Sequence, residues 1–266
     1  MRPFLKWAGS KYKIIDRVCA QLPPGGRLIE PFLGSGAVFL NTSYARYLLA
    51  DANPDLINLF QVLQTCGSQF IEETAKLFTP ENNADPAYYL LREEFNSTLD
   101  TARKSSLFIY LNRHSFNGLC RYNKSGKFNV PFGRYKNPGF PALEMRHFAE
   151  KSRGIKFLSS GFVETMEQAV PGDVVYCDPP YAPLTTTANF SSYTTDGFGI
   201  EDQQRLAKMA CELVSRGIPV VISNHDTLFT RDVYAQARIE SFGVQRFIAA
   251  SAKNRCKVGE LIAVFA

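Results

Sequence analysis

Short apolar runs rich in β-branched residues recur along the chain, with helix-length intervals between them. They occupy residues 27–30, 47–51, 155–158, 173–178 and 219–224. This alternation is typical of a doubly wound α/β sheet whose strands are mostly parallel. Two later runs, 245–250 and 260–265, are too close together for a crossover helix, so we expect them to form an antiparallel hairpin. Together the runs predict a seven-stranded sheet, with a helix over 201–214 among its connections.

The strand pattern disappears in the middle of the chain. Helical signals replace it at 55–63, 87–95 and 102–112, and a region rich in Gly, Asn and Pro follows them. We interpret residues 55–144 as a mainly helical domain inserted into a main domain formed by 1–54 and 145–266. No apolar run approaches the ~20 residues of a membrane span, and the first residues do not resemble a signal peptide. We therefore expect a cytoplasmic protein without a membrane partner.

The positive charge is concentrated in the predicted insert. The chain has 30 Lys and Arg against 25 Asp and Glu, and a net charge of +5. Residues 101–143 contain no acidic side chain, and basic residues there alternate with aromatic ones. Cations neutralise phosphates and rings can stack on bases, so this composition is typical of nucleic-acid binding. The alternative is a solvated basic face whose aromatic residues belong to a local core.

Cysteine and histidine spacing gives no sign of a metal site. The six cysteines lie far apart without a CxxC pair, and we interpret them as reduced thiols of a cytosolic protein. The histidines, His114, His147 and His225, also lack metal-ligand spacing. We expect no metal, and we interpret His225 as a structural residue or a neighbour of a cofactor.

The loop after the first predicted strand is rich in glycine. Gly34 and Gly36 would let the backbone approach a bound nucleotide, and Asp51, at the end of the next strand, could accept hydrogen bonds from ribose hydroxyls. A dinucleotide fingerprint would need a third glycine where Phe39 stands, which argues against NAD. An ordinary tight turn is the alternative.

The fourth predicted strand ends in Asp178-Pro179-Pro180-Tyr181. The carboxyl edge of such a sheet is where α/β enzymes place their chemistry. The exocyclic amine of adenine is a poor nucleophile because its lone pair is delocalised. If Asp178 and the Pro179 carbonyl both accept its hydrogens, the lone pair is freed to attack an activated methyl group. Tyr181 would stack on the base, which must leave the duplex. A turn stiffened by proline is the alternative.

Seven blocks taken together resemble the Dam-type DNA adenine-N6 methyltransferases, of the class in which a cofactor motif, a recognition insert and DPPY follow one another. The blocks are FLKWAGSK (4–11), EPFLGSG (30–36), YLNR (110–113), NGLCRYN (117–123), FNVPFGR (128–134), DPPY (178–181) and ISNHD (222–226). The resemblance implies the fold of a class I S-adenosylmethionine-dependent methyltransferase. It also implies transfer of the methyl group from S-adenosylmethionine to N6 of a flipped adenine in double-stranded DNA, within GATC.

The resemblance further implies the roles of individual residues and of the chain as a whole. S-adenosylhomocysteine would be the second product, the protein would be a monomer in solution, and a bacterial one would associate with the nucleoid. Lys6 and Arg121 would read guanines, unless they contact phosphates nonspecifically. Leu119 and Pro131 would touch thymine methyls, and Asn117 and Arg134 the DNA backbone. Arg113, Phe116 and Asn123 complete the DNA-binding set. The implied cofactor contacts are Trp7, Lys11, Glu30, Phe32, Gly34, Ser35, Gly36, Asp51 and Asp178.

Two residues depart from the family pattern. Phe116 stands where the family often has a tyrosine that enters the base stack, and Ser10 replaces a glycine near the cofactor. The segment 254–257 is basic, and we expect a solvated hairpin turn there. Two other functions remain open: a DNA-binding protein that has lost methyltransferase activity, and an enzyme acting on cytosine N4 or on adenine in RNA.

Overall fold

The computed structural model describes residues 1–182, 198–245 and 257–266. These residues form two compact units. The first, which we call the helical unit, contains Met1–Ile15, Leu33–Ser43 and Asp51–Ser159. The second, the sheet unit, contains Asp16–Phe32, Tyr44–Ala50 and Ser160–Ala266. The units are defined by contacts, and the functional division into a main domain and an insert at 55–144 stays a prediction.

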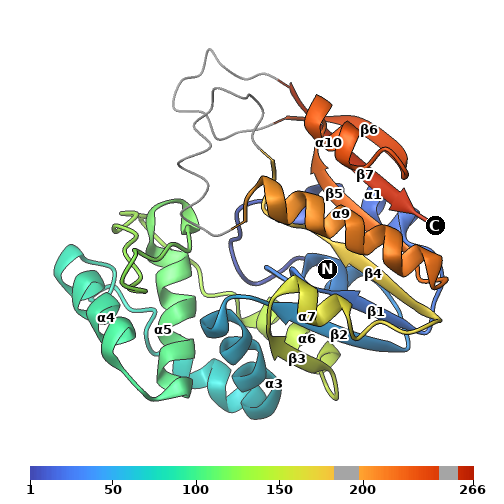
Figure 1. Ribbon diagram of the computed structural model, residues 1–266. Helices are drawn as coiled ribbons and strands as arrows, with labels where there is room; N and C mark the ends of the chain where they lie inside the picture. The colour runs from blue at the N-terminus through green and yellow to red at the C-terminus, as the bar shows by residue number, and fades with distance from the viewer. Residues whose placement is uncertain (183–197, 246–256) are drawn as a thin grey trace. The chain divides into compact units, whose positions relative to one another are not determined.

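The strands form one seven-stranded sheet in the order β3-β2-β1-β4-β5-β7-β6 (Figure 1). Strand β1 is parallel to β2 and β4, and β4 is parallel to β5, whereas β7 is antiparallel to both β5 and β6. This confirms the predicted mostly parallel sheet and its closing antiparallel hairpin. The strands are β1 (Arg27–Glu30), β2 (Arg46–Asp51), β3 (Lys156–Ser159), β4 (Asp173–Cys177), β5 (Val220–His225), β6 (Arg238–Gln245) and β7 (Lys257–Phe265).

One strand differs from the predicted position. Strand β6 begins at Arg238, seven residues before the expected start, and residues 246–256 lie outside the described part. The reason is that β6 is an edge strand with β7 as its partner. The residues of β6 mix polar and apolar side chains, as in Arg238-Ile-Glu-Ser-Phe, and show no continuous apolar run. The basic segment 254–257, expected as a solvated turn, falls almost entirely outside the described residues.

The helices of the sheet unit cover its strands on both faces. In Figure 1, α9 (Ile200–Ser215) lies in front of the strands and α1 (Ile15–Gln21) behind them. Two shorter helices, α7 (Phe162–Met166) and α10 (Leu228–Val233), complete this unit. Helix α9 buries Leu206, Ala207, Ala210 and Leu213, an apolar stripe at helical spacing, and buries Gln203 in the same stripe.

The helical unit is held by four helices and by the side-chain caps of two of them. Helix α3 (Pro54–Ala75) packs against α5 (Thr101–His114) and α6 (Ala142–Lys151), and α4 (Asp85–Ser97) packs against α5. The side chains of Asn53 and Asp100 accept hydrogen bonds from the first backbone N–H groups of α3 and α5. The remaining elements are η1 (Lys11–Ile14), α2 (Ala37–Asn41) and η2 (Phe116–Gly118).

An aromatic core anchors the N-terminal segment in the helical unit. The fully buried Phe4 ring makes edge contacts with Phe60 and Phe148, with ring centroids 5.9 and 5.3 Å apart. Phe60 stacks on Phe148 at 4.6 Å. Burying rings of this size contributes roughly 2–3 kcal/mol each. The segment that carries the predicted residues Lys6 and Trp7 is therefore fixed to the helices beside it.

We expect His114 to make stability depend on pH. It is buried, its Nδ1 donates to the Tyr110 carbonyl at 2.8 Å, and burial lowers its pKa to about 4. The unfolded chain binds a proton near pH 6.5, so the free energy of unfolding falls as pH drops from 6.5 towards 4, by up to about 3 kcal/mol. Urea unfolding of wild type and His114→Asn should differ in this slope. Equal slopes, or the same change in a His147→Gln control, would contradict the assignment.

Candidate active site

Asp178 directly follows β4, and its carboxylate is oriented by a chain of hydroxyl groups. The Ser223 Oγ on the neighbouring strand β5 donates to Asp178 Oδ1 at 2.9 Å. The Tyr176 hydroxyl lies 3.0 Å from the same Ser223 oxygen. Because Ser223 has one proton and gives it to the carboxylate, Tyr176 must donate to Ser223. Burial raises the pKa of Tyr176, which keeps it a donor.

Hydrogen bonds and a ring contact hold Tyr181 and Ala182, which follow Asp178 along the chain. The Tyr181 hydroxyl donates to Glu260 Oε2 at 3.4 Å, and its ring meets the His225 ring edge-on at 4.7 Å. The Ala182 N–H donates to Asn224 Oδ1 at 3.0 Å, and the Ala182 carbonyl accepts from His225 Nδ1 at 2.6 Å. His225 is therefore a structural residue of this loop, one of the two readings expected for it.

Three rings gather beside the end of β1. Phe32 stacks on Phe162 at 5.6 Å and contacts Phe198 edge-on at 5.5 Å. Glu30, the last residue of β1, is buried. The sequence predicted Glu30 and Phe32 but not the other two rings, because Phe162 and Phe198 lie in segments without a recognisable motif.

The predicted glycine turn lies in the helical unit together with Asp51. The Gly34 N–H donates to Asp51 Oδ2 at 2.9 Å, and the Asn53 N–H donates to Asp51 Oδ1 at 3.0 Å. Burial raises the pKa of Asp51, while these two N–H groups lower it. Gly34 and Gly36 have φ values of +49° and +70°, which only glycine adopts without strain.

Trp7 packs directly on this turn. A Cβ at position 34 would lie 2.8 Å from the Trp7 Nε1, so a side chain there would displace the indole. The Ser10 hydroxyl, a departure from the family pattern, lies 3.0 Å from the Ser35 hydroxyl and joins the N-terminal segment to the turn. Lys11 is buried, and its Nζ donates to the Gly9 carbonyl at 2.6 Å. The helical unit thus brings together three segments, which carry Trp7 and Lys11, Gly34, Ser35 and Gly36, and Asp51.

Asn112 on α5 places Lys6. Its Oδ1 accepts from the Lys6 N–H at 2.9 Å, and its Nδ2 donates to the carbonyls of Lys6 at 2.7 Å and Gly118 at 3.2 Å. Burial, followed by the charges of Arg113 and Arg2, lowers the pKa of Lys6. Sequence reasoning missed Asn112; its signal is an amide within an otherwise apolar stretch of helix.

Arg121 lies in a hairpin whose other residues hold its shape. Its Nε donates to Asn129 Oδ1 at 2.7 Å, and the Asn129 N–H donates back to the Arg121 carbonyl at 3.1 Å. The Asn123 side chain accepts from the N–H groups of Ser125 and Lys127, each at 3.0 Å, and so forms the turn. Asn123 was predicted to bind DNA, and its Oδ1 is used within the hairpin.

The other predicted DNA-binding residues vary in exposure. Asn117 and Arg134 have φ values of +55° and +54°, uncommon for residues with a side chain. Arg134 also pairs with Asp85 at 3.1 Å. Arg113 is half-buried, and its Nε donates to the Gly139 carbonyl at 2.9 Å. Leu119 is half-buried, and Pro131 is exposed.

The aromatic residues of the basic stretch divide into two groups. Phe108, Tyr110 and Phe128 are buried, so for them the alternative of a local core is correct. Phe116 is 51% exposed and is available to a partner. The structure therefore leaves one of these predicted stacking rings clearly on the surface.

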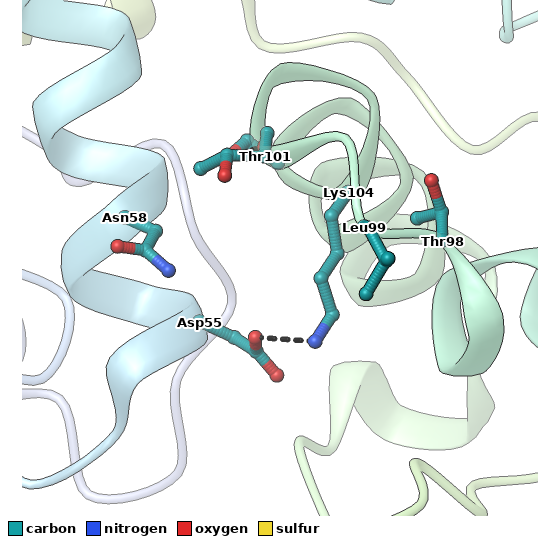
Figure 2. A pocket seen from close by; sticks show the side chains of 7 residues that line it. Asp55, Asn58, Thr98, Leu99, Thr101 and Lys104 are labelled. Atoms are coloured by element: carbon teal, nitrogen blue, oxygen red, sulfur yellow. Dashed lines mark hydrogen bonds and ion pairs between the residues drawn. The ribbon is translucent and has the colours of Figure 1, made fainter.

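The helical unit also has an open pocket that is separate from the predicted site residues. Figure 2 labels six of its seven lining residues. An ion pair between Lys104 Nζ and Asp55 Oδ1, 2.8 Å long, crosses it. None of the predicted site residues lines it. The Tyr122 hydroxyl donates to the other oxygen of Asp55 at 2.8 Å, so Asp55 ties the hairpin to α3.

Three further observations concern the described part of the chain. Its five cysteines form no disulfide, and Cys256 lies outside it. In residues 1–182, 198–245 and 257–266, no group of three or more His, Cys, Asp or Glu side chains is arranged to hold a metal ion. None of the helices described there is both long and apolar enough to span a membrane.

Comparison with known proteins connects these sites to a function. The family model described as D12 class N6 adenine-specific DNA methyltransferase matches residues 7–248. A DNA adenine methylase of Serratia marcescens is 52% identical over 265 residues, which cover 99% of this chain and 98% of the relative. A DNA adenine methylase of Escherichia coli (strain K12) is 50% identical over 264 residues, covering 99% and 95%. One of Vibrio cholerae serotype O1 is 49% identical over 265 residues, covering 99% and 96%.

Proposed function

Because the chain belongs to the D12 class of N6 adenine-specific DNA methyltransferases, we propose that it methylates the adenine of GATC in double-stranded DNA, with S-adenosylmethionine as methyl donor. The observation that carries this proposal is the orientation of the Asp178 carboxylate. Asp178 begins the Asp-Pro-Pro-Tyr loop, and its carboxylate accepts a hydrogen bond from the Ser223 hydroxyl. The adenine leaves the duplex, since its N6 is otherwise paired. We further propose that the protein acts as a monomer in the cytoplasm, where its substrate lies.

The loop residues act on the adenine amine. Asp178 and the Pro179 carbonyl accept the two N6 hydrogens and favour a tetrahedral nitrogen, and Tyr181 stacks on the base. A bond forms between N6 and the methyl carbon as the bond from that carbon to sulfur breaks, and its electron pair stays on sulfur. The nitrogen then loses one proton, which the Asp178 carboxylate can accept. Acceptors fixed in advance act most strongly as positive charge develops on nitrogen, so they favour the transition state.

Each unit, taken by itself, holds residues that we propose as contacts of the methyl donor. When bound, S-adenosylmethionine supplies a methyl group activated by a cationic sulfur. Asp51 presents a carboxylate for ribose hydroxyls beside the glycine turn on which Trp7 packs. The rings around Phe32 and the carboxylates favour a cationic ligand. The proposed contacts are Trp7, Lys11, Gly34, Ser35, Gly36 and Asp51 from the helical unit, and Glu30, Phe32 and Asp178 from the sheet unit.

Basic residues of the helical unit read the DNA. Lys6 and Arg121 present charged donors, which suit the N7 and O6 acceptors of guanine. Leu119 and Pro131 contact thymine methyls, and Asn117 and Arg134 contact the backbone. Arg113 and Asn123 complete the proposed DNA-binding set. The exposed Phe116 ring wedges into the stack in place of a tyrosine.

Methyl transfer from labelled S-adenosylmethionine tests the proposal. We expect label on adenine in a duplex with one GATC site, and little label on duplexes that differ from it by one base. Label on cytosine, or on adenine of RNA, would replace the proposed substrate. Cofactor binding without any transfer would instead indicate a DNA-binding protein that has lost its activity.

A second prediction concerns the glycine turn. Gly34→Ala should weaken binding of S-adenosylhomocysteine by about tenfold or more, because the new Cβ displaces the Trp7 indole. Gly154→Ala is the matched control: its φ is +73°, and a Cβ there meets nothing within 4 Å. Each variant should lose about 1 kcal/mol of unfolding free energy through backbone strain. Calorimetric titration and thermal unfolding separate the two effects, and equal affinity in both variants would remove Trp7 and Gly34 from the cofactor site.

A further inference from the structure

Gln203 is a polar side chain within the apolar stripe of α9. It is only 3% exposed, so each of its polar atoms needs a partner. Its Nε2 donates to the Pro180 carbonyl at 2.7 Å. Its Oε1 accepts from Asn224 Nδ2 and from the Tyr234 hydroxyl, each at 3.0 Å. The side chain therefore joins helix α9, strand β5 and Tyr234, the residue after helix α10, to the proposed catalytic loop.

The backbone fixes the direction of every hydrogen bond in this network. Asn224 Oδ1 accepts from the N–H groups of Ala182 and His225, so the other end of the amide, Nδ2, must donate. Gln203 Oε1 receives that donor, which leaves Gln203 Nε2 to face the Pro180 carbonyl. Tyr234 braces the arrangement, since its hydroxyl accepts from Asn224 Nδ2 at 3.0 Å and donates to Gln203. Asn224 and Tyr234 are fully buried, so water does not compete.

The hydrogen bond from Gln203 to the Pro180 carbonyl determines the geometry of the residues on either side of Pro180. The proline ring fixes φ of Pro180, so only its ψ angle separates the peptide plane of the Pro179 carbonyl from the plane that leads into Tyr181. Holding the Pro180 carbonyl fixes this angle. Among the described residues, no hydrogen bond uses the Pro179 carbonyl, whereas the Pro180 carbonyl is taken by Gln203. Gln203 thus donates a hydrogen bond to the Pro180 carbonyl, which is next to the carbonyl proposed to accept an N6 hydrogen of adenine.

We propose that Gln203 is a positioning residue for methyl transfer: through the Pro180 carbonyl it sets the orientation of the Pro179 carbonyl relative to the Tyr181 ring. This inference rests on the proposed function of the loop. Gln203 itself acts through Pro180 and has no contact with the substrate in this role. Its loss should lower kcat and leave the KM for S-adenosylmethionine nearly unchanged.

Replacement by methionine tests the role with little change in volume. We expect Gln203→Met to lower kcat about 10- to 100-fold, since small displacements of reacting groups cost this much. The control is Gln204→Met, at the exposed neighbouring position of the same helix, which should keep the wild-type kcat. Gln203→Met with wild-type kcat would overturn the proposal, as would a loss of cofactor affinity that accounts for the whole defect.

Replacement by glutamate adds a readout that a purely structural role would not change. A protonated carboxyl can donate to the Pro180 carbonyl, whereas an ionised one repels it. The ratio of kcat in Gln203→Glu to kcat in wild type should therefore fall as pH rises, while the same ratio for Gln203→Met stays flat. Far-ultraviolet circular dichroism at each pH verifies that the variant is folded. A flat ratio for folded Gln203→Glu would refute the assignment.

Tyr234→Phe keeps the test decisive if the variants at 203 do not fold. It removes one of the two donors to Gln203 Oε1 and keeps the buried ring, so kcat should fall about 2- to 5-fold with KM unchanged. An unchanged kcat there would count against the network. Wild-type enzyme that fails to label GATC adenine would refute the proposed function instead, and the two failures are distinguishable.

Discussion

Asp178→Ala should lower kcat by at least about 10³-fold while the protein still binds S-adenosylhomocysteine and DNA. The variant loses a hydrogen-bond acceptor that stabilises the positive charge developing on the amine nitrogen. Losing a single preorganised partner of this kind lowers kcat by about 10²- to 10³-fold. In the proposed mechanism the carboxylate also accepts the proton that the nitrogen must lose, so the loss of kcat should reach the upper end of this range. Single-turnover transfer of labelled methyl to a GATC duplex measures kcat, and titrations measure the two affinities.

Asp173 provides the matched control on the same strand. Its carboxylate pairs with Arg27, which donates to it through Nε at 3.0 Å and Nη2 at 2.5 Å, and it is buried at the opposite end of β4. Asp173→Asn should lower the melting temperature and keep kcat, because it weakens the contacts of Asp173 with Arg27 and with the Val170 N–H, at the end of β4 away from Asp178. If Asp178→Ala retained turnover, or if Asp173→Asn lost as much, the assignment of Asp178 to the reaction would be wrong.

Arg121→Ala should remove discrimination at one base pair of GATC. A charged donor facing a guanine contributes about 1–3 kcal/mol of preference, so kcat/KM for the substituted site should rise relative to GATC by about 5- to 150-fold. The guanidinium is held in the hairpin by Asn129 at 2.7 Å, so the side chain is already ordered before DNA binds. A panel of duplexes with single-base changes gives the preference at each position.

Lys124 is the control for nonspecific contact. It is exposed in the turn of the same hairpin. Lys124→Ala should weaken DNA binding uniformly over all sequences, and the slope of log binding constant against log salt concentration should become shallower by about one. The same uniform loss in Arg121→Ala would show that Arg121 contacts phosphate, the alternative left open by its sequence.

Sequence analysis worked best for features that depend on the residue types themselves and on their immediate neighbours in the chain. Gly34 and Gly36 were expected in a turn after the first strand, and both lie there with positive φ; their approach to a nucleotide stays a prediction. Strand β4 is buried along its whole length, so it appears in the sequence as an uninterrupted apolar run ending at Asp178. Edge strand β6 was misplaced, because its mixed polar and apolar residues resemble those of many exposed segments.

The supporting residues could not be read in the same way. Ser223, Gln203 and Asn112 are ordinary polar residues, and their roles depend on partners 45, 23 and 106 positions away in the chain. For Gln203 a signal does exist: a glutamine in the apolar stripe of an amphipathic helix must have a hydrogen-bond partner when buried. The identity of that partner, the Pro180 carbonyl, is not encoded in any local pattern.

The sequence by itself determined the α/β sheet, the basic stretch and the tetrapeptide at 178–181, because local apolar periodicity, charge and proline or glycine chemistry act over a few residues. Only the tertiary structure decided which rings are buried and which polar side chains hold the proposed catalytic loop. Phe108 and Phe116 are alike as residues, yet one is in the core and the other on the surface. The physical reason is that burial and hydrogen-bond partnership are properties of neighbours in space, which the chain brings together only when it folds.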